Sequence, residues 1–360
     1  MRIRTLTLLS VLALVVAACG GAGSEDGTTS TAADSTTTAP SAEAVLLSYE
    51  LEPGTSFDYE VDMNQTIDLT TSGDTAALGE EELPGDMSIV LSGTTTFQHT
   101  VSDGPEPGTY SIEITGDFSD LEVSGTVDGE PVDPAEVPEM AEMEPVSVTL
   151  VVDEQGNVIP DDSGGLGGDF LGDLGGLDML DEFGMSGGPG QFVGPPLPDE
   201  EVTVGDTWSE TIEVPAMPDD EPITTQIDNE VLDTDTIDGT EVFVIGTTTT
   251  TSPVEFDLAE LLVGFLTAFV PEDATDEEMA EMEALAEQLR FAFSIDETVG
   301  EMTSWFDFEA GVTRQAEYTS DTHMVMDVNI PDETTGEMVE FAMDMTIGQD
   351  LTYRLTGTSA

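Results

Sequence analysis

Cys19 is the only cysteine of the 360-residue chain, and the residues before it have the composition of an export signal. Residues 1–4 carry two arginines, residues 6–16 are mostly apolar, and residues 17–18 are both alanine. A basic segment, a short apolar segment and a small-residue cleavage site are typical of a secretory signal peptide. The apolar run is shorter than the about 20 residues that cross a bilayer, so we do not expect a membrane-spanning helix there.

The run Val16-Ala17-Ala18-Cys19 resembles the lipobox of bacterial lipoproteins, with Val16 at a position where Leu is more usual. The resemblance implies that residues 1–18 are removed and that Cys19 is acylated on its sulfur, with fatty acids such as palmitate, and on its new amino terminus. Each buried methylene contributes about 0.8 kcal/mol, so several chains hold a protein to a membrane durably. We therefore expect an extracytoplasmic lipoprotein anchored in the cell membrane or outer envelope. The alternative is an ordinary secretory signal with an incidental cysteine.

The charge balance restricts the partners of the mature protein. The chain has 77 acidic residues and 5 basic ones, all arginine, and removal of the signal leaves Arg290, Arg314 and Arg354. Nucleic acid is excluded as a partner, because phosphate binding requires a basic surface. The acidity has two interpretations: operation in salty or calcium-rich surroundings, where ions screen the self-repulsion, or solubility of a surface protein.

The residues that usually carry enzyme chemistry are scarce. His99 and His323 lie in strand-like runs, and no Gly-x-Ser-x-Gly sequence provides a hydrolase nucleophile. The chain has no lysine for a Schiff base, and the mature chain has no second thiol for zinc or a redox centre. We therefore expect a protein without enzymatic activity and without a cofactor.

Residues 233–239, with sequence DTDTIDG, resemble the start of a calcium-binding loop. Ile237 occupies the third ligand position, however, and no glutamate follows at the spacing such a loop requires. The segment is better interpreted as a hairpin with a turn at Asp238-Gly239. We expect no defined metal site and, at most, weak Ca²⁺ binding by scattered carboxylates.

The mature chain divides into a tether and one domain. Residues 19–44 contain the lipidated cysteine and a Ser/Thr/Gly-rich stretch without aromatic residues, which cannot bury enough apolar surface to become ordered. A flexible coil of this length spans about 25–30 Å on average. Residues 45–360 form a single β-rich domain in this interpretation.

Alternation of apolar and polar residues predicts many strands in this domain. The dipeptides Asp128-Gly129 and Asp238-Gly239 predict tight hairpin turns. The predicted strands include residues 57–63, 87–101, 110–114, 146–152, 211–214, 223–232, 242–251, 303–308, 312–318, 323–330, 339–347 and 351–355.

Two segments interrupt the strands. Residues 160–199 are Gly-rich, with apolar residues at spacings of three and four. The glycines disfavour a helix, so we expect a flexible insertion, and the alternative is an apolar flap over a groove.

Residues 256–293 predict an inserted helical pair, in which Pro271 ends the first helix and Thr275 with Glu278 caps the second. The apolar residues of the pair belong either to the core or to the wall of a cavity for an acyl chain or another apolar ligand. The candidate ligand-binding residues are Leu258, Leu262, Phe265, Phe269, Met279, Met282, Leu289 and Phe293.

The predicted fold is mainly β, a β-rich α+β class, with a large antiparallel curved sheet or open barrel and the inserted helical pair at its mouth. This order of elements, together with the lipobox, resembles the half-barrel envelope lipoproteins of the LolA and LppX type. The resemblance implies a concave apolar sheet under a helical lid, and hence a carrier of a lipid or other apolar ligand. The alternative is an acidic surface lipoprotein that engages cations or basic partners.

Overall fold

The structure is a computed structural model, and its described part begins at residue 44. Cys19, the predicted signal peptide and almost all of the predicted tether lie outside the described residues. None of the described residues is helical, so no helix in them could cross a membrane. The described residues are 44–49, 51–73, 85–117, 121–132, 146–153, 155–156, 159, 194–214, 222–257, 290–331 and 338–359.

The described residues form sixteen strands. In chain order they are β1 Val45–Leu46, β2 Ser56–Gly73, β3 Asp86–Asp103, β4 Thr109–Asp117, β5 Glu122–Val127, β6 Glu130–Pro131, β7 Val146–Asp153, β8 Glu201–Val202, β9 Thr207–Val214, β10 Ile223–Ile237, β11 Thr240–Thr251, β12 Val254–Asp257, β13 Arg290–Ile295, β14 Thr298–Asp307, β15 Val312–Pro331 and β16 Met338–Ser359.

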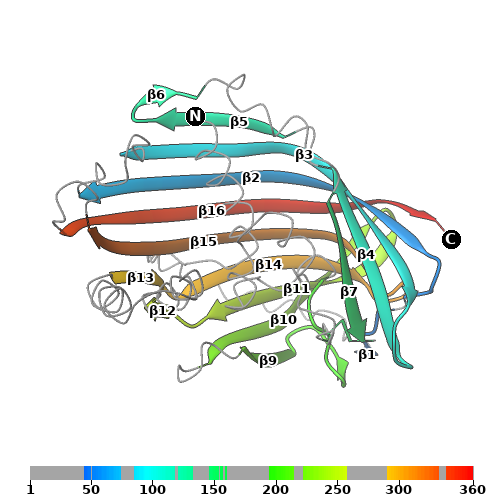
Figure 1. Cartoon of the computed structure of the whole chain (residues 1–360). Coiled ribbons are helices and arrows are strands. Elements are labelled where there is room, and N and C mark those ends of the chain that lie inside the picture. Colours follow the sequence, from blue (N-terminus) through cyan, green and yellow to red (C-terminus); the bar gives the residue numbers. More distant parts are fainter. Residues whose placement is uncertain are drawn as a thin grey trace, which may run out of the picture.

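Fourteen of these strands belong to one antiparallel sheet, with the order β6-β5-β3-β2-β16-β15-β14-β11-β10-β9 along its main path (Figure 1). The sheet is open, with β6 and β9 at opposite ends of this path. Its long strands change partners along their length: β3 pairs first with β5 and then with β4, while β15 pairs first with β14 and then with β13. In Figure 1, β4 and β7 run steeply across one end of the sheet.

The predicted antiparallel β architecture is confirmed, and so are both predicted hairpin turns. β5 and β6 are joined by Asp128-Gly129, and β10 and β11 by Asp238-Gly239. All four turn residues have positive φ, as a two-residue turn between twisted strands requires. The stretch that resembles a calcium loop is therefore the end of a hairpin.

The predicted helical pair over residues 256–293 is not supported. Its two ends are strands, because Val254–Asp257 forms β12 and Arg290–Ile295 forms β13, with Phe256 opposite Phe293. β12 pairs with β13, and β13 also pairs with β15. This pairing holds both strands in an extended conformation, although the spacing of apolar residues in this segment is that of a helix. Residues 258–289 lie outside the described part of the chain.

The central strands are longer than predicted. Residues 312–318 and 323–330 are parts of the single strand β15, and residues 339–347 and 351–355 are parts of β16. β2 likewise continues for ten residues beyond the predicted end at Met63, to Gly73. The predicted breaks coincide with positions where a polar side chain lies on the buried face of the sheet.

The sheet has a buried inner face and a polar outer face, because side chains alternate along each strand. On β2 the buried series begins Phe57, Tyr59 and Val61, and the acidic residues between them are only partly buried. Two apolar clusters occupy the inner face.

The first apolar cluster has a second layer above the sheet. Its members from outside the fourteen-stranded sheet include Leu47, Tyr49, Leu51, Leu197 and Val202. Leu197 lies at the end of the predicted Gly-rich insertion, so this end of the insertion belongs to the core. Residues 160–193 of the insertion lie outside the described residues.

Candidate functional site

The second apolar cluster is the part of the inner face that could hold an apolar ligand. All its members come from the fourteen-stranded sheet or from Val132 directly after β6, and no second layer from the described residues joins it. The buried members are Ile67, Leu69, Met87, Ile89, Leu91, Ile223, Val254, Ile295, Met324, Met345 and Ile347, with Val123, Val127, Val132, Phe293 and Met343 packed against them.

Of the sequence-predicted ligand-binding residues, the structure describes Phe293. It lies on β13, is partly buried and packs against the second apolar cluster. The other predicted residues, Leu258, Leu262, Phe265, Phe269, Met279, Met282 and Leu289, lie outside the described residues, as does the predicted lipidation site Cys19.

A polar row separates the two apolar clusters on the inner face. Gln65 of β2 is opposite Gln349 of β16, and Gln349 is opposite Ser320 of β15. The exposed fractions of the three residues are 0%, 8% and 8%. Residues that are directly opposite in an antiparallel pair point to the same face, so the three side chains form one continuous row. We refer to Gln65, Gln349 and Ser320 as the polar row.

The neighbouring register positions belong to the apolar clusters. Along β16, Leu351 lies two residues after Gln349 and belongs to the first apolar cluster. Ile347 lies two residues before Gln349 and belongs to the second. The side-chain oxygen Oε1 of Gln349 is buried and accepts no hydrogen bond. An unpaired buried acceptor costs about 1–3 kcal/mol. The sequence analysis missed this row, although the breaks it predicted within β15 and β16 mark where the row crosses these strands.

The two histidines have opposite electrostatic environments. Burial lowers the pKa of His99 to about 4, and its ring packs against that of Tyr59 at an interplanar angle of 40°, with 4.7 Å between the ring centroids. His323 lies on the outer face, where its Nδ1 is 2.7 Å from Asp296 Oδ2 and its Nε2 is 3.1 Å from Asp344 Oδ1. The hydrogen bond with Asp296 is the main cause that raises the pKa of His323. Both ring nitrogens of His323 face carboxylates, an arrangement that does not activate a serine nucleophile.

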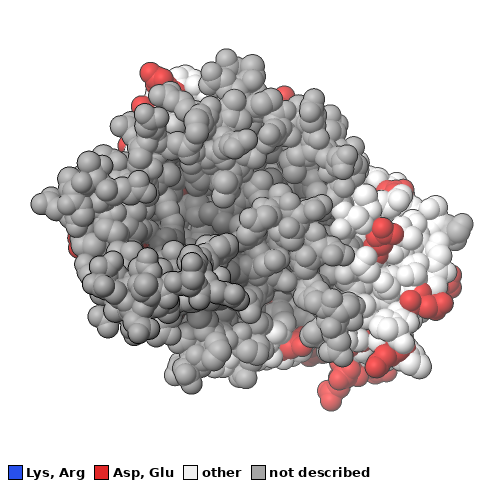
Figure 2. Space-filling view, viewed as in Figure 1, with Lys and Arg blue, Asp and Glu red and all other residues white. Residues whose placement is uncertain are grey.

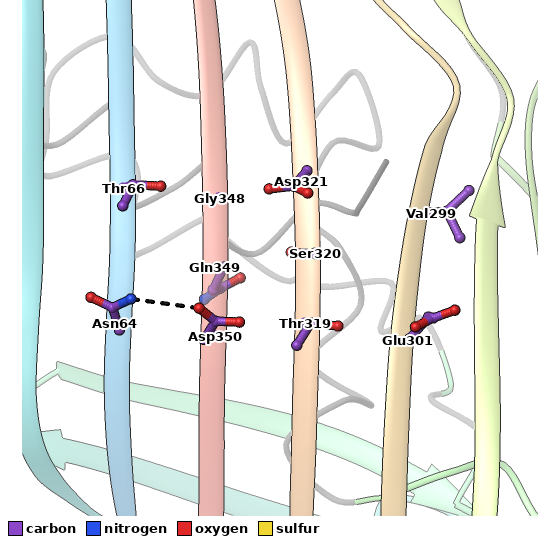
Figure 3. Close-up of a pocket in the computed structure, with 10 residues that line it drawn as sticks. All are labelled: Asn64, Thr66, Val299, Glu301, Thr319, Ser320, Asp321, Gly348, Gln349 and Asp350. Atoms are coloured by element: carbon purple, nitrogen blue, oxygen red, sulfur yellow. Dashed lines mark hydrogen bonds between the residues drawn. The ribbon is translucent and has the colours of Figure 1, made fainter. Parts of the chain in front are cut away.

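The outer face has a shallow polar depression of about 340 Å³ across β2, β16, β15 and β14 (Figure 3). Gly348 lies between Thr66 and Asp321 in Figure 3, and a Cβ at this position would come within 2.7 Å of Thr66 Oγ1 and 2.9 Å of Asp321 Oδ1. Carboxylates of Glu301, Asp321 and Asp350 surround it, and Asn64 Nδ2 donates to Asp350 Oδ2 over 3.5 Å. Among the described residues, no group of three histidines, cysteines or carboxylates is arranged to hold a metal ion.

The described arginine side chains are paired with aspartates. Arg314 donates through Nε and Nη2 to Asp307 Oδ2, over 2.9 and 2.7 Å, and Asp307 is 1% exposed. Arg354 Nη1 lies 3.2 Å from Asp62 Oδ2 on the outer face. Asp and Glu are scattered over the described surface seen in Figure 2. The outer face is therefore acidic, whereas the inner face is mainly apolar and includes the polar row.

No protein-family model and no curated protein sequence matches the chain. Among solved structures, the outer membrane protein OprG from Pseudomonas aeruginosa aligns over 86% of this chain and 100% of its own, with 7% sequence identity and a TM-score of 0.19. The Salmonella SPI-1 secretin InvG in its open-gate state aligns over 85% of this chain and 61% of its own, with 10% identity and a TM-score of 0.15. TM-scores this low carry no argument about fold, family or function.

Proposed function

We propose that this chain is a lipoprotein of the bacterial envelope, anchored through Cys19, which carries a lipid or another apolar ligand on the inner face of its sheet. It has no enzymatic activity and no cofactor. The tether of residues 19–44 holds the domain at the membrane surface on the extracytoplasmic side.

The observation that carries this proposal is the difference between the two apolar clusters. The first apolar cluster includes a second layer of described residues, among them Leu47 and Val202, and therefore forms a hydrophobic core between the sheet and that layer. The second apolar cluster draws its members from one sheet, and the described part of the chain adds no layer over it. Methionine side chains such as Met324 and Met345, which are 2% and 8% exposed, suit an interior that holds flexible acyl chains, because methionine adapts its shape.

The chemistry of the titratable groups supports a binding function rather than catalysis. His99 is neutral and packed in the core, and His323 is held between Asp296 and Asp344. Neither arrangement presents a general base to a nucleophile.

Native mass spectrometry of the mature chain, released from detergent micelles and followed by lipid extraction, tests the proposal. We expect one apolar species at a defined stoichiometry, in addition to the covalent anchor. A chain of the bare mass, with no extractable lipid and no uptake of added lipid, would contradict the carrier function. Lipid that is bound at variable stoichiometry to any surface of the protein would contradict it as well.

A second candidate function follows from the outer face, where the depression around Gly348 is surrounded by Glu301, Asp321 and Asp350. In this alternative the acidic exterior engages cations, such as weakly bound Ca²⁺, or basic proteins. Thermal melting over a calcium series tests it: a rise in Tm that Asp321→Asn reduces, and that Asp233→Asn in the distant β10 leaves unchanged, would favour this function. An unchanged Tm would count against it.

A further inference from the structure

We infer that four methionine side chains on the inner face of the sheet bind one soft monovalent metal ion, Cu(I). The ligands are the thioether sulfurs of Met324 and Met326 on β15 and of Met343 and Met345 on β16. We refer to these four residues as the methionine quartet. The inference goes beyond the proposed function, and the binding of a lipid neither supports nor contradicts it.

The strand register brings the quartet together. Met324 is directly opposite Met345, and Met326 is directly opposite Met343. Met324 and Met345 belong to the second apolar cluster on the inner face. Alternate residues of a strand point to the same face, and so do residues that are opposite each other in an antiparallel pair. All four methionines therefore point to the inner face, as two adjacent pairs.

The spacing of these pairs suits one ion. The Cβ atoms of opposite residues are about 4.5–5.5 Å apart, and those of alternate residues along a strand are about 7 Å apart. The centre of such a rectangle lies about 4 Å from each corner. A methionine side chain has three rotatable bonds, so each sulfur can turn toward the centre while the backbone pairing is retained.

The ligand chemistry specifies the ion. Thioether sulfur is a soft, uncharged ligand that favours Cu(I), whereas Ca²⁺ and Mg²⁺ require oxygen ligands. Four sulfurs also leave no open coordination position for a substrate, so the site holds the ion without catalysis. The inner-face residues that flank the quartet on β13 and β2 are uncharged: Phe293, Ile295, Leu69 and Thr71. A hard divalent cation therefore finds no carboxylate among these neighbours.

Burial and charge both permit an ion to reach the quartet. Met324 and Met345 are 2% and 8% exposed, whereas Met326 and Met343 are only partly buried. An ion enters when the two partly buried side chains rotate, and it does not require a cavity as large as a lipid does. The strong negative charge of the chain attracts cations to the protein, and a monovalent ion is less costly to desolvate than a divalent one.

The test measures binding of Cu(I) to the mature chain in detergent micelles without oxygen. Ascorbate keeps the copper reduced, a chromophoric Cu(I) chelator competes for it, and an excess of Ca²⁺ occupies the surface carboxylates. We expect one Cu(I) per chain that Ca²⁺ does not displace. X-ray absorption at the copper edge should show sulfur ligands without oxygen or nitrogen.

Methionine-to-leucine variants remove sulfur and nearly conserve the side-chain volume. Met324→Leu combined with Met345→Leu removes two ligands and should abolish one-to-one binding. Met343→Leu alone, at a partly buried position, serves if the double variant does not fold, which unfolding in urea detects; we expect its Kd to rise about tenfold. Met302→Leu is the matched control, because Met302 is 8% exposed like Met345 but lies in the first apolar cluster on β14. It should bind Cu(I) as the unaltered chain does.

Three results would overturn the inference. The first is a chain that loses all its Cu(I) to the chelator, in which case the methionines only pack the interior. The second is copper bound through oxygen, which assigns it to surface carboxylates. The third is unchanged affinity in the folded variant that lacks the sulfurs of Met324 and Met345, which excludes the quartet as the site. None of these results bears on the lipid-carrier function, which is measured without copper.

Discussion

Arg314 and Arg354 offer a matched test of what an ion pair contributes in a protein of extreme negative charge. Each arginine carries one positive charge, so replacing either one with methionine changes the net charge by the same amount. Gln315, directly after Arg314 on β15, is opposite Arg354 on β16, so the two sites share nearly the same place in the sheet. Their aspartate partners differ sharply in burial: Asp307 is 1% exposed and Asp62 is 46% exposed.

The expected magnitudes follow from that difference. Asp307 Oδ1 accepts from the backbone N–H groups of Glu309 and Ala310, and Asp307 Oδ2 accepts two hydrogen bonds from Arg314. Arg314→Met leaves a buried carboxylate without a positive partner, which costs about 3–5 kcal/mol. Because the Arg314 side chain is 34% exposed, water can reach the vacated position, and we expect a value near the lower end. Arg354→Met breaks an exposed pair and should cost at most about 1 kcal/mol.

Urea unfolding of both variants at 0.15 M salt, followed by tryptophan fluorescence, measures these free energies. The control for lost packing is Asp307→Asn combined with Arg314→Met, which removes both charges and should recover much of the stability lost in Arg314→Met. The reasoning is refuted if Arg314→Met and Arg354→Met differ by less than about 1 kcal/mol, or if the double variant is no more stable than Arg314→Met.

Four further predictions concern single side chains. The pKa of His99 is 6.5 in the unfolded chain and about 4 in the folded chain. The free energy of unfolding should therefore fall by up to about 3 kcal/mol as the pH drops from 6.5 to 4, because only the unfolded chain binds the proton readily in this range. In His99→Gln, urea unfolding should show a smaller dependence on pH. His323 has the opposite sign, because its raised folded pKa adds stability below its unfolded pKa that is lost as the pH rises through the folded pKa, and for an exposed pair we expect less than about 1 kcal/mol. A pH series of urea unfolding in which His323→Gln shows the same loss as the unaltered chain would contradict this prediction. Gln349→Leu should raise the free energy of unfolding of the lipid-free chain by about 1–3 kcal/mol, because it removes an unpaired buried acceptor, and a lower Tm would show that Oε1 has a partner. Cys19→Ser should leave the signal uncut or release the protein from membranes in a fractionation assay, whereas a membrane-bound, lipidated variant would disprove the anchor.

The sequence predicts the local structure of this protein better than its long-range pairing. The Asp-Gly turns at 128–129 and 238–239 are recognisable because only a few residue types tolerate positive φ at both turn positions. Strand register and order were not predictable, because β16 pairs with β2 across nearly the whole chain and no local pattern encodes that partner.

The errors of the sequence analysis have a common physical cause. Strands are predicted from apolar alternation, which is interrupted where the inner face is polar, so the predicted strands end near Ser320 within β15 and near Gln349 within β16. The same residues belong to the buried polar row, so the missed strand continuity and the missed row are one feature. Phe256 and Phe293 were assigned to helices from their spacing, but pairing between β12 and β13 makes them strand residues.

The place of the last strand has a consequence for how this protein is made. β16 lies between β2 and β15 in the middle of the sheet and pairs with β2 from Phe341 opposite Gly73 to Ser359 opposite Ser56. Until these C-terminal residues have been synthesised, β2 and β15 have no strand to connect them, so the sheet exists only as two separate pieces. Contacts between such distant residues form slowly. We expect the two pieces to join into one sheet only when Met338–Ser359 has been synthesised and pairs with both of them.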